Sequence, residues 1–135
     1  EEMNTIFNKK SGVYGLSGGF SDFSDLGKGM EEGNDRCRLA LDVFAYGVKK
    51  YIGAYAAAMG GVDAIAFTAG IGENNPYVRN LAMSDMEYMG ITIDQEANKV
   101  MGDEKLISTP DSKVKVFVVP TNEELAIARE TVALV

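Results

Sequence analysis

The fold is decided by residues 64–74, which read Ala-Ile-Ala-Phe-Thr-Ala-Gly-Ile-Gly-Glu-Asn. The first four residues are uncharged and form a run short enough for a β-strand covered on both faces, as in a parallel sheet. Residues 70–74 follow the strand directly, and their glycines let backbone N–H groups approach an anion closely. We therefore expect a buried strand that runs straight into a glycine-rich loop.

A long helix is predicted immediately before this strand. Apolar side chains recur every third or fourth residue from about Asp35 to Met59, with Asn34 or Asp35 as N-cap and Gly60 as the stop. The apolar arc is wider than a surface helix needs, which indicates that part of the helix packs against a second body. The residues that widen it are Ala40, Ala45, Tyr51 and Ala56.

Further helices and a second strand are predicted after residue 74. Asn75 and Pro76 are a good N-cap and first residue for a helix that reaches Met89. A β-branched run over 114–119 predicts a strand. Thr121-Asn122-Glu123-Glu124 then matches a capping box, in which Thr121 and Glu124 cap each other at the head of a terminal helix.

This alternation of helices and strands predicts an α/β fold with a short, mostly parallel sheet flanked by helices. At the start of the chain we expect one or two helical turns over residues 3–8, a loop or edge strand over 13–16, and a solvated connection over 21–33. Smaller elements are expected as a strand at 91–93, a short helix at 94–100 and an edge strand at 106–107.

Composition narrows the class of protein. A chain of 135 residues allows one domain, and its net charge of −7 argues against nucleic acid and anionic membranes as partners. The uncharged stretch 52–62 is shorter than a membrane span, and Cys37, the one cysteine, predicts a reducing, cytoplasmic setting. Because the chain begins with Glu-Glu-Met-Asn and not with an initiator Met or a signal sequence, we expect a piece of a longer protein.

Two loops are candidate binding sites because ligands bind beyond the carboxyl ends of parallel strands. Residues 70–74 suit a nucleotide phosphate or ribose, the alternative being a tight strand-to-helix turn. Glu123 is a candidate Mg²⁺ ligand, the alternative being stabilisation of a helix dipole. The loop 17–25 could bond a ribose or base edge, or could be a simple turn.

Other chemistry-bearing residues are interpreted as structural. Cys37 is expected to be a partly buried structural thiol, Arg79 a helix-surface cation, and Lys49 and Lys50 a solvated face. The chain has no histidine, so nucleophilic hydrolysis by a serine or cysteine with a histidine base has no support.

Taken together, several motifs resemble the acetate kinase family, in that family's order and over nearly the whole chain. They are Asn8-Lys9-Lys10-Ser11-Gly12, Ser21-Asp22-Phe23, Tyr51-Ile52-Gly53-Ala54-Tyr55, Phe67-Thr68-Ala69-Gly70-Ile71-Gly72-Glu73-Asn74, and Val119-Pro120-Thr121-Asn122-Glu123-Glu124. The resemblance implies a partial ribonuclease H-like lobe of the actin-like ATPase type. It also implies that residues 1–135 are a fragment of the C-terminal, nucleotide-binding lobe of a longer, two-lobed enzyme.

The resemblance also implies roles for particular residues. Asp22, Phe23 and Ser24 would lie by the adenosine of ATP or ADP, and Glu123 would be the carboxylate associated with Mg²⁺. The contacts to the rest of the nucleotide would come from Gly70, Ile71, Gly72, Glu73 and Asn74. Two positions depart from the family's usual pattern, because Ser24 and Gly47 stand where it commonly has arginine. Ser24 cannot stack on adenine or offer a planar fork of donors.

The reaction implied is reversible transfer of the γ-phosphoryl group of ATP to acetate, which gives acetyl phosphate and ADP. Such catalysis consists mainly of alignment and charge neutralisation by arginines and Mg²⁺. By the resemblance, the catalytic arginines, histidines and aspartate lie outside this chain, so we expect no catalytic residue here and no turnover by the chain alone. The alternatives are a propionate or butyrate kinase fragment and a non-catalytic dimerisation module. A homodimer is expected from the family.

Overall fold

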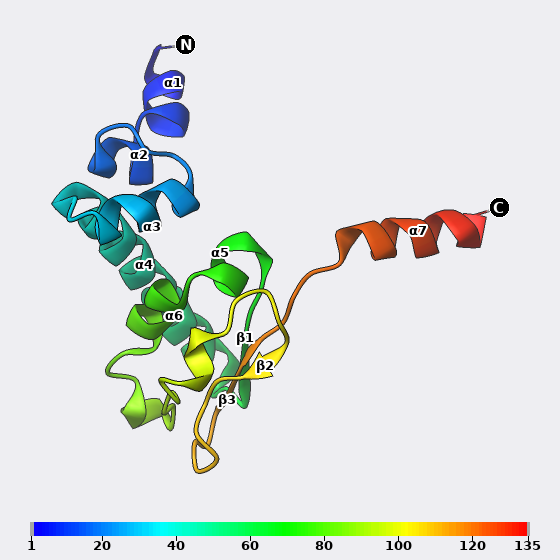
Figure 1. The fold of residues 1–135 in the computed structure, drawn as a ribbon. Coiled ribbons are helices and arrows are strands. Elements are labelled where there is room, and N and C mark those ends of the chain that lie inside the picture. Colours follow the sequence, from blue (N-terminus) through cyan, green and yellow to red (C-terminus); the bar gives the residue numbers. More distant parts are fainter. Residues whose placement is uncertain (1, 135) are drawn as a thin grey trace.

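A computed structural model describes residues 2–134 and shows an α/β fold built around a small mixed sheet (Figure 1). The strands are β1 (Ala64–Phe67), β2 (Lys105–Leu106) and β3 (Lys115–Val118), in the order β1-β3-β2. β1 pairs with β3 in parallel, with Phe67 opposite Val118, and β2 pairs with β3 in antiparallel fashion. The expected class is confirmed, and the sheet contains one parallel and one antiparallel pair.

The described residues also form seven α-helices and two short 3-10 helices. The α-helices are α1 (Glu2–Lys9), α2 (Gly12–Ser17), α3 (Phe23–Glu31), α4 (Asp35–Met59), α5 (Ala69–Asn74), α6 (Pro76–Met83) and α7 (Glu123–Leu134). The 3-10 helices are η1 (Glu87–Met89) and η2 (Ala97–Lys99). None of these helices is both long enough and apolar enough to cross a bilayer.

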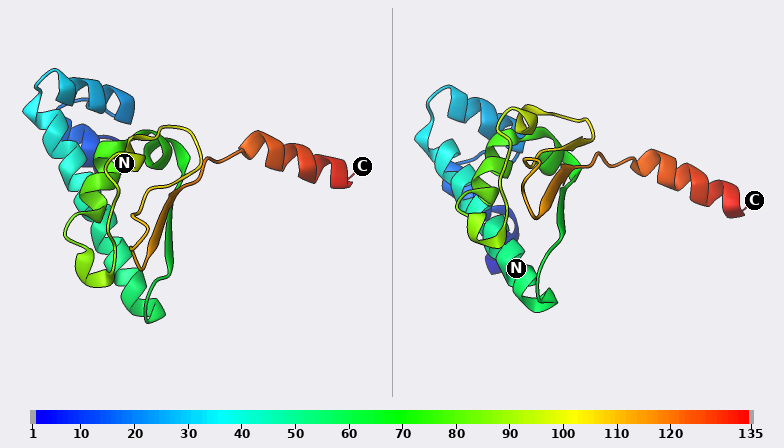
Figure 2. Two further views of the ribbon diagram at one scale, coloured as in Figure 1. Left: turned by 60° about the horizontal axis from the view of Figure 1, so that its bottom comes forward. Right: turned by 90° about the horizontal axis from the view of Figure 1, so that it is seen from below.

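Helices α4 and α6 lie side by side on one face of the sheet (Figure 2). The core there joins the buried side chains of Val116 and Val118 in β3 to Met83 and Met86, with Val48 and other half-buried residues of α4 at its margin. The strand β1 was expected to be covered on both faces, but Ala64 and Ala66 are exposed. That expectation is wrong for the described residues because the helices cover only one face of β1.

The long predicted helix is confirmed as α4. The Asn34 side chain accepts hydrogen bonds from the backbone N–H groups of Arg36 and Cys37, and Gly60 ends the helix in the left-handed conformation. Leu41 and Cys37 are fully buried in a second core formed with α3 and α6. The apolar stripe continues past this core, and its last residues, Tyr55 and Met59, are more than 60% exposed.

Two segments near the start of the chain are helical where the sequence predicted none. Residues 13–16 lie in α2 and residues 23–31 form α3. The α3 N-cap is Asp22, whose carboxylate accepts from the backbone N–H groups of Ser24 and Asp25. Gly27, Gly29 and Gly33 suggested a solvated connection over residues 21–33. In the structure Gly29 lies against Cys37 of α4, so its missing side chain permits close packing of the two helices. Residues 3–8 are helical as expected.

The helix that starts at Pro76 was predicted to reach Met89, but it ends at Met83. Its start is confirmed, because the Asn75 side chain accepts from the backbone N–H of Val78. The Ser84 hydroxyl donates to the Leu81 carbonyl, and Asp85 adopts a positive φ of 54° that a continuous helix cannot contain. The short strand expected at 91–93 is reduced to a bridge between Ile93 and Ser108.

The terminal helix α7 exists, but the capping box at its start does not form. Thr121 donates to Glu73 instead of pairing with Glu124, and the Asn122 side chain accepts from the backbone N–H of Leu125. Figure 1 shows α7 pointing away from the body of the molecule, and none of its described residues is buried.

We predict that Gly29→Ala lowers the free energy of unfolding, while Gly27→Ala two residues earlier does not. A Cβ at position 29 would lie 2.6 Å from the Cys37 sulfur, whereas nothing lies within 4 Å of one at position 27. Forcing the buried contact apart should cost about 1–3 kcal/mol. At position 27 the higher helix propensity of alanine should add up to about 1 kcal/mol. Urea unfolding of both variants measures the difference, and equal stabilities would contradict this packing.

Candidate functional site

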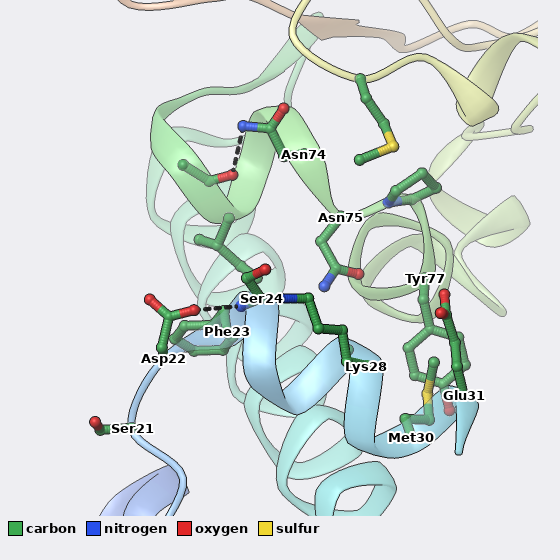
Figure 3. Close-up of a pocket in the computed structure, with 15 residues that line it drawn as sticks. Ser21, Asp22, Phe23, Ser24, Lys28, Met30, Glu31, Asn74, Asn75 and Tyr77 are labelled. Atoms are coloured by element: carbon green, nitrogen blue, oxygen red, sulfur yellow. Dashed lines mark hydrogen bonds between the residues drawn. The ribbon is translucent and has the colours of Figure 1, made fainter. Parts of the chain in front are cut away.

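A pocket with a volume of about 870 Å³ lies between α3, α5 and the start of α6 (Figure 3). Its walls come from segments that are far apart in the sequence. Residues 21–24 and the following turns of α3 form one wall, and residues 70–77 form the opposite wall. Met101 completes the lining.

This pocket brings together most of the residues that the sequence nominated. Asp22, Phe23 and Ser24 line one side of it. Gly70, Ile71 and Asn74 line the other side. Gly72, Glu73 and Glu123 do not line it, and the reason differs for each.

The α3 wall is fixed by its N-cap and by an aromatic contact. Asp22 Oδ1 accepts from the Ser24 N–H at 2.7 Å and from the Asp25 N–H at 3.3 Å, which holds the start of α3. The Phe23 ring meets the Phe44 ring of α4 edge to face, with centroids 4.6 Å apart. These contacts leave the Ser24 side chain exposed at the pocket.

The opposite wall is the short helix α5, where the sequence predicted a glycine-rich loop over residues 70–74. The chain turns out of β1 through Ala69, whose φ is +58°, and helical residues follow at once. A Cβ on Gly72 would lie 3.2 Å from the backbone carbon of Phe67, so this glycine permits α5 to lie against the end of β1. Because the first N–H groups of a helix lack intrahelical partners, the start of α5 still offers donors.

Glu73 connects the two strand ends that the sequence singled out. Its Oε1 accepts from the Thr121 backbone N–H at 2.9 Å and from the Thr121 hydroxyl at 3.0 Å, and the residue is 9% exposed. The turns after β1 and β3 therefore meet at one edge of the sheet, as the parallel pairing requires. The Glu73 carboxylate points to this contact and not into the pocket.

Glu123 begins α7 and is exposed. Within residues 2–134 no group of three or more cysteine, aspartate or glutamate side chains gathers to hold a metal ion. Mg²⁺ bound to a nucleotide typically takes only one or two protein carboxylates, because phosphates and water supply its other ligands. Glu123 fits that limited role, two residues after the contact between Thr121 and Glu73.

Arg79 was predicted to be a helix-surface cation, and that prediction is wrong. Its side chain is fully buried, and burial lowers the pKa of the guanidinium. It donates to the carbonyl oxygens of Gly72 and Glu73 in α5 and to Asn98 and Val100 near η2. One signal was present in the sequence, because Arg79 lies on the same face of its helix as the apolar residues Ala82 and Met83.

Three further polar residues line the pocket that no sequence motif had indicated, Lys28, Glu31 and Tyr77. The Tyr77 hydroxyl donates to Asp42 of α4 at 2.7 Å. Burial, followed by the interaction with Asp42, raises the pKa of Tyr77. The spacing of Lys28 and Glu31 from Ser24, about one and two helical turns, would have placed them at this wall had α3 been predicted as a helix.

The model of the acetokinase family matches residues 1–129 of the chain. The chain belongs to this family. Among acetokinase relatives, it is 59% identical to an acetate kinase of Dictyoglomus thermophilum over 135 residues, which is all of this chain and 34% of the relative. It is 60% identical to an acetate kinase of Caldicellulosiruptor saccharolyticus over 133 residues, which is 97% of this chain and 33% of the relative.

Solved acetokinase structures have the same fold. The crystal structure of acetate kinase from Porphyromonas gingivalis matches with a TM-score of 0.90 and 48% identity, over 97% of this chain and 33% of that one. A propionate kinase from Francisella tularensis matches with a TM-score of 0.83 and 32% identity, over 96% of this chain and 33% of that one. The chain thus spans about a third of the length of its relatives. Its placement in their C-terminal lobe stays a prediction.

We predict that Glu73→Ala destabilises the protein, because it leaves the Thr121 N–H and hydroxyl without their acceptor. Leaving a part-buried donor unpaired should lower the free energy of unfolding by about 1–3 kcal/mol. Thr121→Val should cost less, because the backbone N–H keeps its bond to Glu73. Glu104→Ala is the control, since Glu104 is exposed. Thermal unfolding orders the three variants, and a Glu73→Ala protein as stable as the control would contradict the contact.

Proposed function

We propose that this chain is part of an acetate kinase, which transfers the γ-phosphoryl group of ATP reversibly to acetate to give acetyl phosphate and ADP. The chain supplies one part of the nucleotide and Mg²⁺ site. The observation that carries the proposal is the pocket itself, because it joins Asp22, Phe23 and Ser24 to Gly70, Ile71 and Asn74 across more than forty residues of sequence. A proposal that the chain lies in the cytoplasm rests on its family and its single buried cysteine.

The pocket suits a nucleotide because its two walls differ in chemistry. The α3 wall offers the Asp22 carboxylate and the Ser24 hydroxyl, which can accept hydrogen bonds from ribose hydroxyls. The α5 wall offers glycines and the N–H groups of a helix start, which favour the phosphates. The nucleoside therefore belongs at α3, and the phosphates point along α5 toward the strand ends.

The charge on the phosphates must be neutralised, and this chain can do so only in part. Lys28 is the one cation among the residues that line the described pocket, and no arginine lines it. Mg²⁺, when bound with the nucleotide, would neutralise part of this charge, and Glu123 would help to hold it. The remaining cations and the residues that align acetate must come from other parts of the complete protein, so no residue of this chain is assigned a catalytic role.

A second candidate function is a dimerisation module. One exposed face of α4 carries two tyrosines, Tyr51 and Tyr55, each more than 60% exposed, whose rings lie 6.0 Å apart. Exposed aromatic clusters are typical of protein interfaces. Homodimerisation through this face is compatible with kinase activity, so the two proposals are separated by nucleotide binding and not by oligomeric state.

The decisive experiment measures Mg-ATP binding and acetyl phosphate formation by the complete protein that contains this chain. We expect Gly70→Leu to abolish the heat of Mg-ATP binding measured by titration calorimetry. No atom of the described chain lies within 4 Å of a Cβ at position 70, so the leucine side chain would fit and would occupy the pocket. Gly47→Leu is the matched control in α4, away from the pocket and likewise open. The isolated chain should produce no acetyl phosphate.

The outcomes separate the alternatives. A wild-type protein that binds no Mg-ATP but shows a concentration-dependent mass would support the dimerisation module and reject the kinase. Faster turnover of propionate or butyrate than of acetate would reassign the substrate. Turnover by the isolated chain would overturn the view that catalytic residues lie elsewhere.

We predict that Ser24→Arg strengthens nucleotide binding. Ser24 is exposed on the α3 wall, and a guanidinium there could stack on the base and donate to the ribose. A cation stacked on an aromatic face contributes about 0.5–2 kcal/mol, so the KM for ATP should fall by a factor of about 2 to 30. Ser21→Arg adds the same charge nearby and is the control. An equal decrease in both variants would show that charge alone, and not position 24, is responsible.

A further inference from the structure

Arg79 is a buried cation whose partners are carbonyl groups and not carboxylates. Its five hydrogen bonds reach four backbone carbonyl oxygens and the side-chain oxygen of Asn98, at distances from 2.6 to 2.9 Å. No ion pair within residues 2–134 involves it. Transfer of a charge into the interior is costly unless the charge is fully hydrogen-bonded. A neutral apolar side chain would avoid this cost, so the position of the guanidinium needs another explanation.

The carbonyl partners of Arg79 come from two segments that both form the pocket. Gly72 and Glu73 belong to α5, whose Gly70, Ile71 and Asn74 line it. Asn98 and Val100 belong to η2 and the residue after it, and Met101, which also lines the pocket, follows directly.

The main chain adds a parallel connection between these segments, because the Gly102 N–H donates to the Glu73 carbonyl at 3.3 Å. Arg79 thus joins α5 to the segment 98–102 without lining the pocket itself.

The end of α5 is a site that needs such donors. The last carbonyl groups of a helix have no intrahelical partners and carry partial negative charge. In a helix of six residues these groups are a large share of the total, so α5 depends on donors from outside. Arg79 Nη1 supplies them at 2.8 and 2.9 Å. Its planar fork serves both segments at once, which the single ammonium of a lysine cannot do.

We propose that Arg79 is a positioning residue for the nucleotide site: it holds α5 and the Met101 segment at the separation that the nucleotide requires, without touching the nucleotide itself. This inference rests on the proposed function. A positioning role differs from a purely structural role in one measurable respect. Loss of folded protein lowers the amount of active enzyme and leaves KM unchanged, whereas displacement of α5 raises the KM for ATP and spares the KM for acetate.

The test uses the complete protein with Arg79→Met, Arg79→Lys and Arg36→Met. Arg36 is the matched control, because its guanidinium also donates to two backbone carbonyls, those of Leu16 and Gly15, away from the pocket. We expect Arg79→Met to raise the KM for Mg-ATP about tenfold, the equivalent of about 1.4 kcal/mol of binding free energy. Arg79→Lys should give an intermediate value, and Arg36→Met should leave both KM values unchanged.

A second variant covers the case in which Arg79→Met does not fold. Asn98→Ala removes one acceptor of Arg79, together with the Asn98 amide donor to the Pro76 carbonyl, and leaves the four carbonyl partners of Arg79, so the KM for ATP should rise by a smaller factor in the same direction. Unchanged KM for ATP in the folded variants, or an equal rise in the KM for acetate, would overturn the positioning role. A wild-type protein that binds no Mg-ATP would instead reject the proposed function, so the two failures are distinguishable.

Discussion

The parallel pairing of β1 with β3 is the constraint on which the rest of the structure depends. With Phe67 opposite Val118, both strands end at the same edge of the sheet, and the Val119 N–H donates to the Phe67 carbonyl at 2.9 Å. The chain must then leave both strands from that edge, which brings α5 and the turn before α7 together. β2 pairs with the other side of β3, so β3 becomes the central strand and its Val116 and Val118 are fully buried.

Polar contacts beneath this edge decide how the turns are placed. Glu73 and Arg79 are both buried and ionisable, yet neither forms an ion pair within the described residues. Each is hydrogen-bonded to backbone groups and to one neutral polar side chain, the Thr121 hydroxyl for Glu73 and the Asn98 amide oxygen for Arg79. Such contacts are directional, so they fix the orientation of α5 more closely than apolar packing would. The same contacts explain why α5 is stable although its first four residues include Ala69, Gly70 and Gly72.

The candidate site combines this rigid edge with a wall from the other end of the chain. Helix α3 packs against α4 through the buried cluster of Leu26, Cys37 and Leu41, and this packing positions the α3 wall of the pocket. Both walls therefore rest on packed helices, while Ser24 is exposed at the pocket and the exposed Lys28 ammonium lies 3.8 Å from the Asp25 carboxylate. The α5 wall offers backbone donors and the α3 wall offers oxygen acceptors, so the two walls differ in hydrogen-bonding character.

The sequence alone determined the elements whose signals are local. The period of apolar residues specified α4, an uncharged run specified β1 and a β-branched run specified β3. Asn34 and Asn75 specified two helix starts. Each of these signals depends on neighbours within a few residues. The motifs nominated residues that the structure places on both walls of one pocket, and the role of these residues in binding stays a prediction.

Tertiary structure decided the rest, because the groups involved find partners far along the chain. Glycines in α3 and α5 suggested loops, but Gly29 packs on Cys37 and Gly72 packs on Phe67, and these contacts outweigh the low helix propensity of glycine. Thr121 donates to Glu73, 48 residues away, instead of forming a local cap. The buried Arg79 donates to carbonyl groups 19 and 21 residues downstream, as well as to carbonyl groups of α5. A buried polar group takes whichever partner the packed fold supplies, and no pattern of nearby residues encodes that choice.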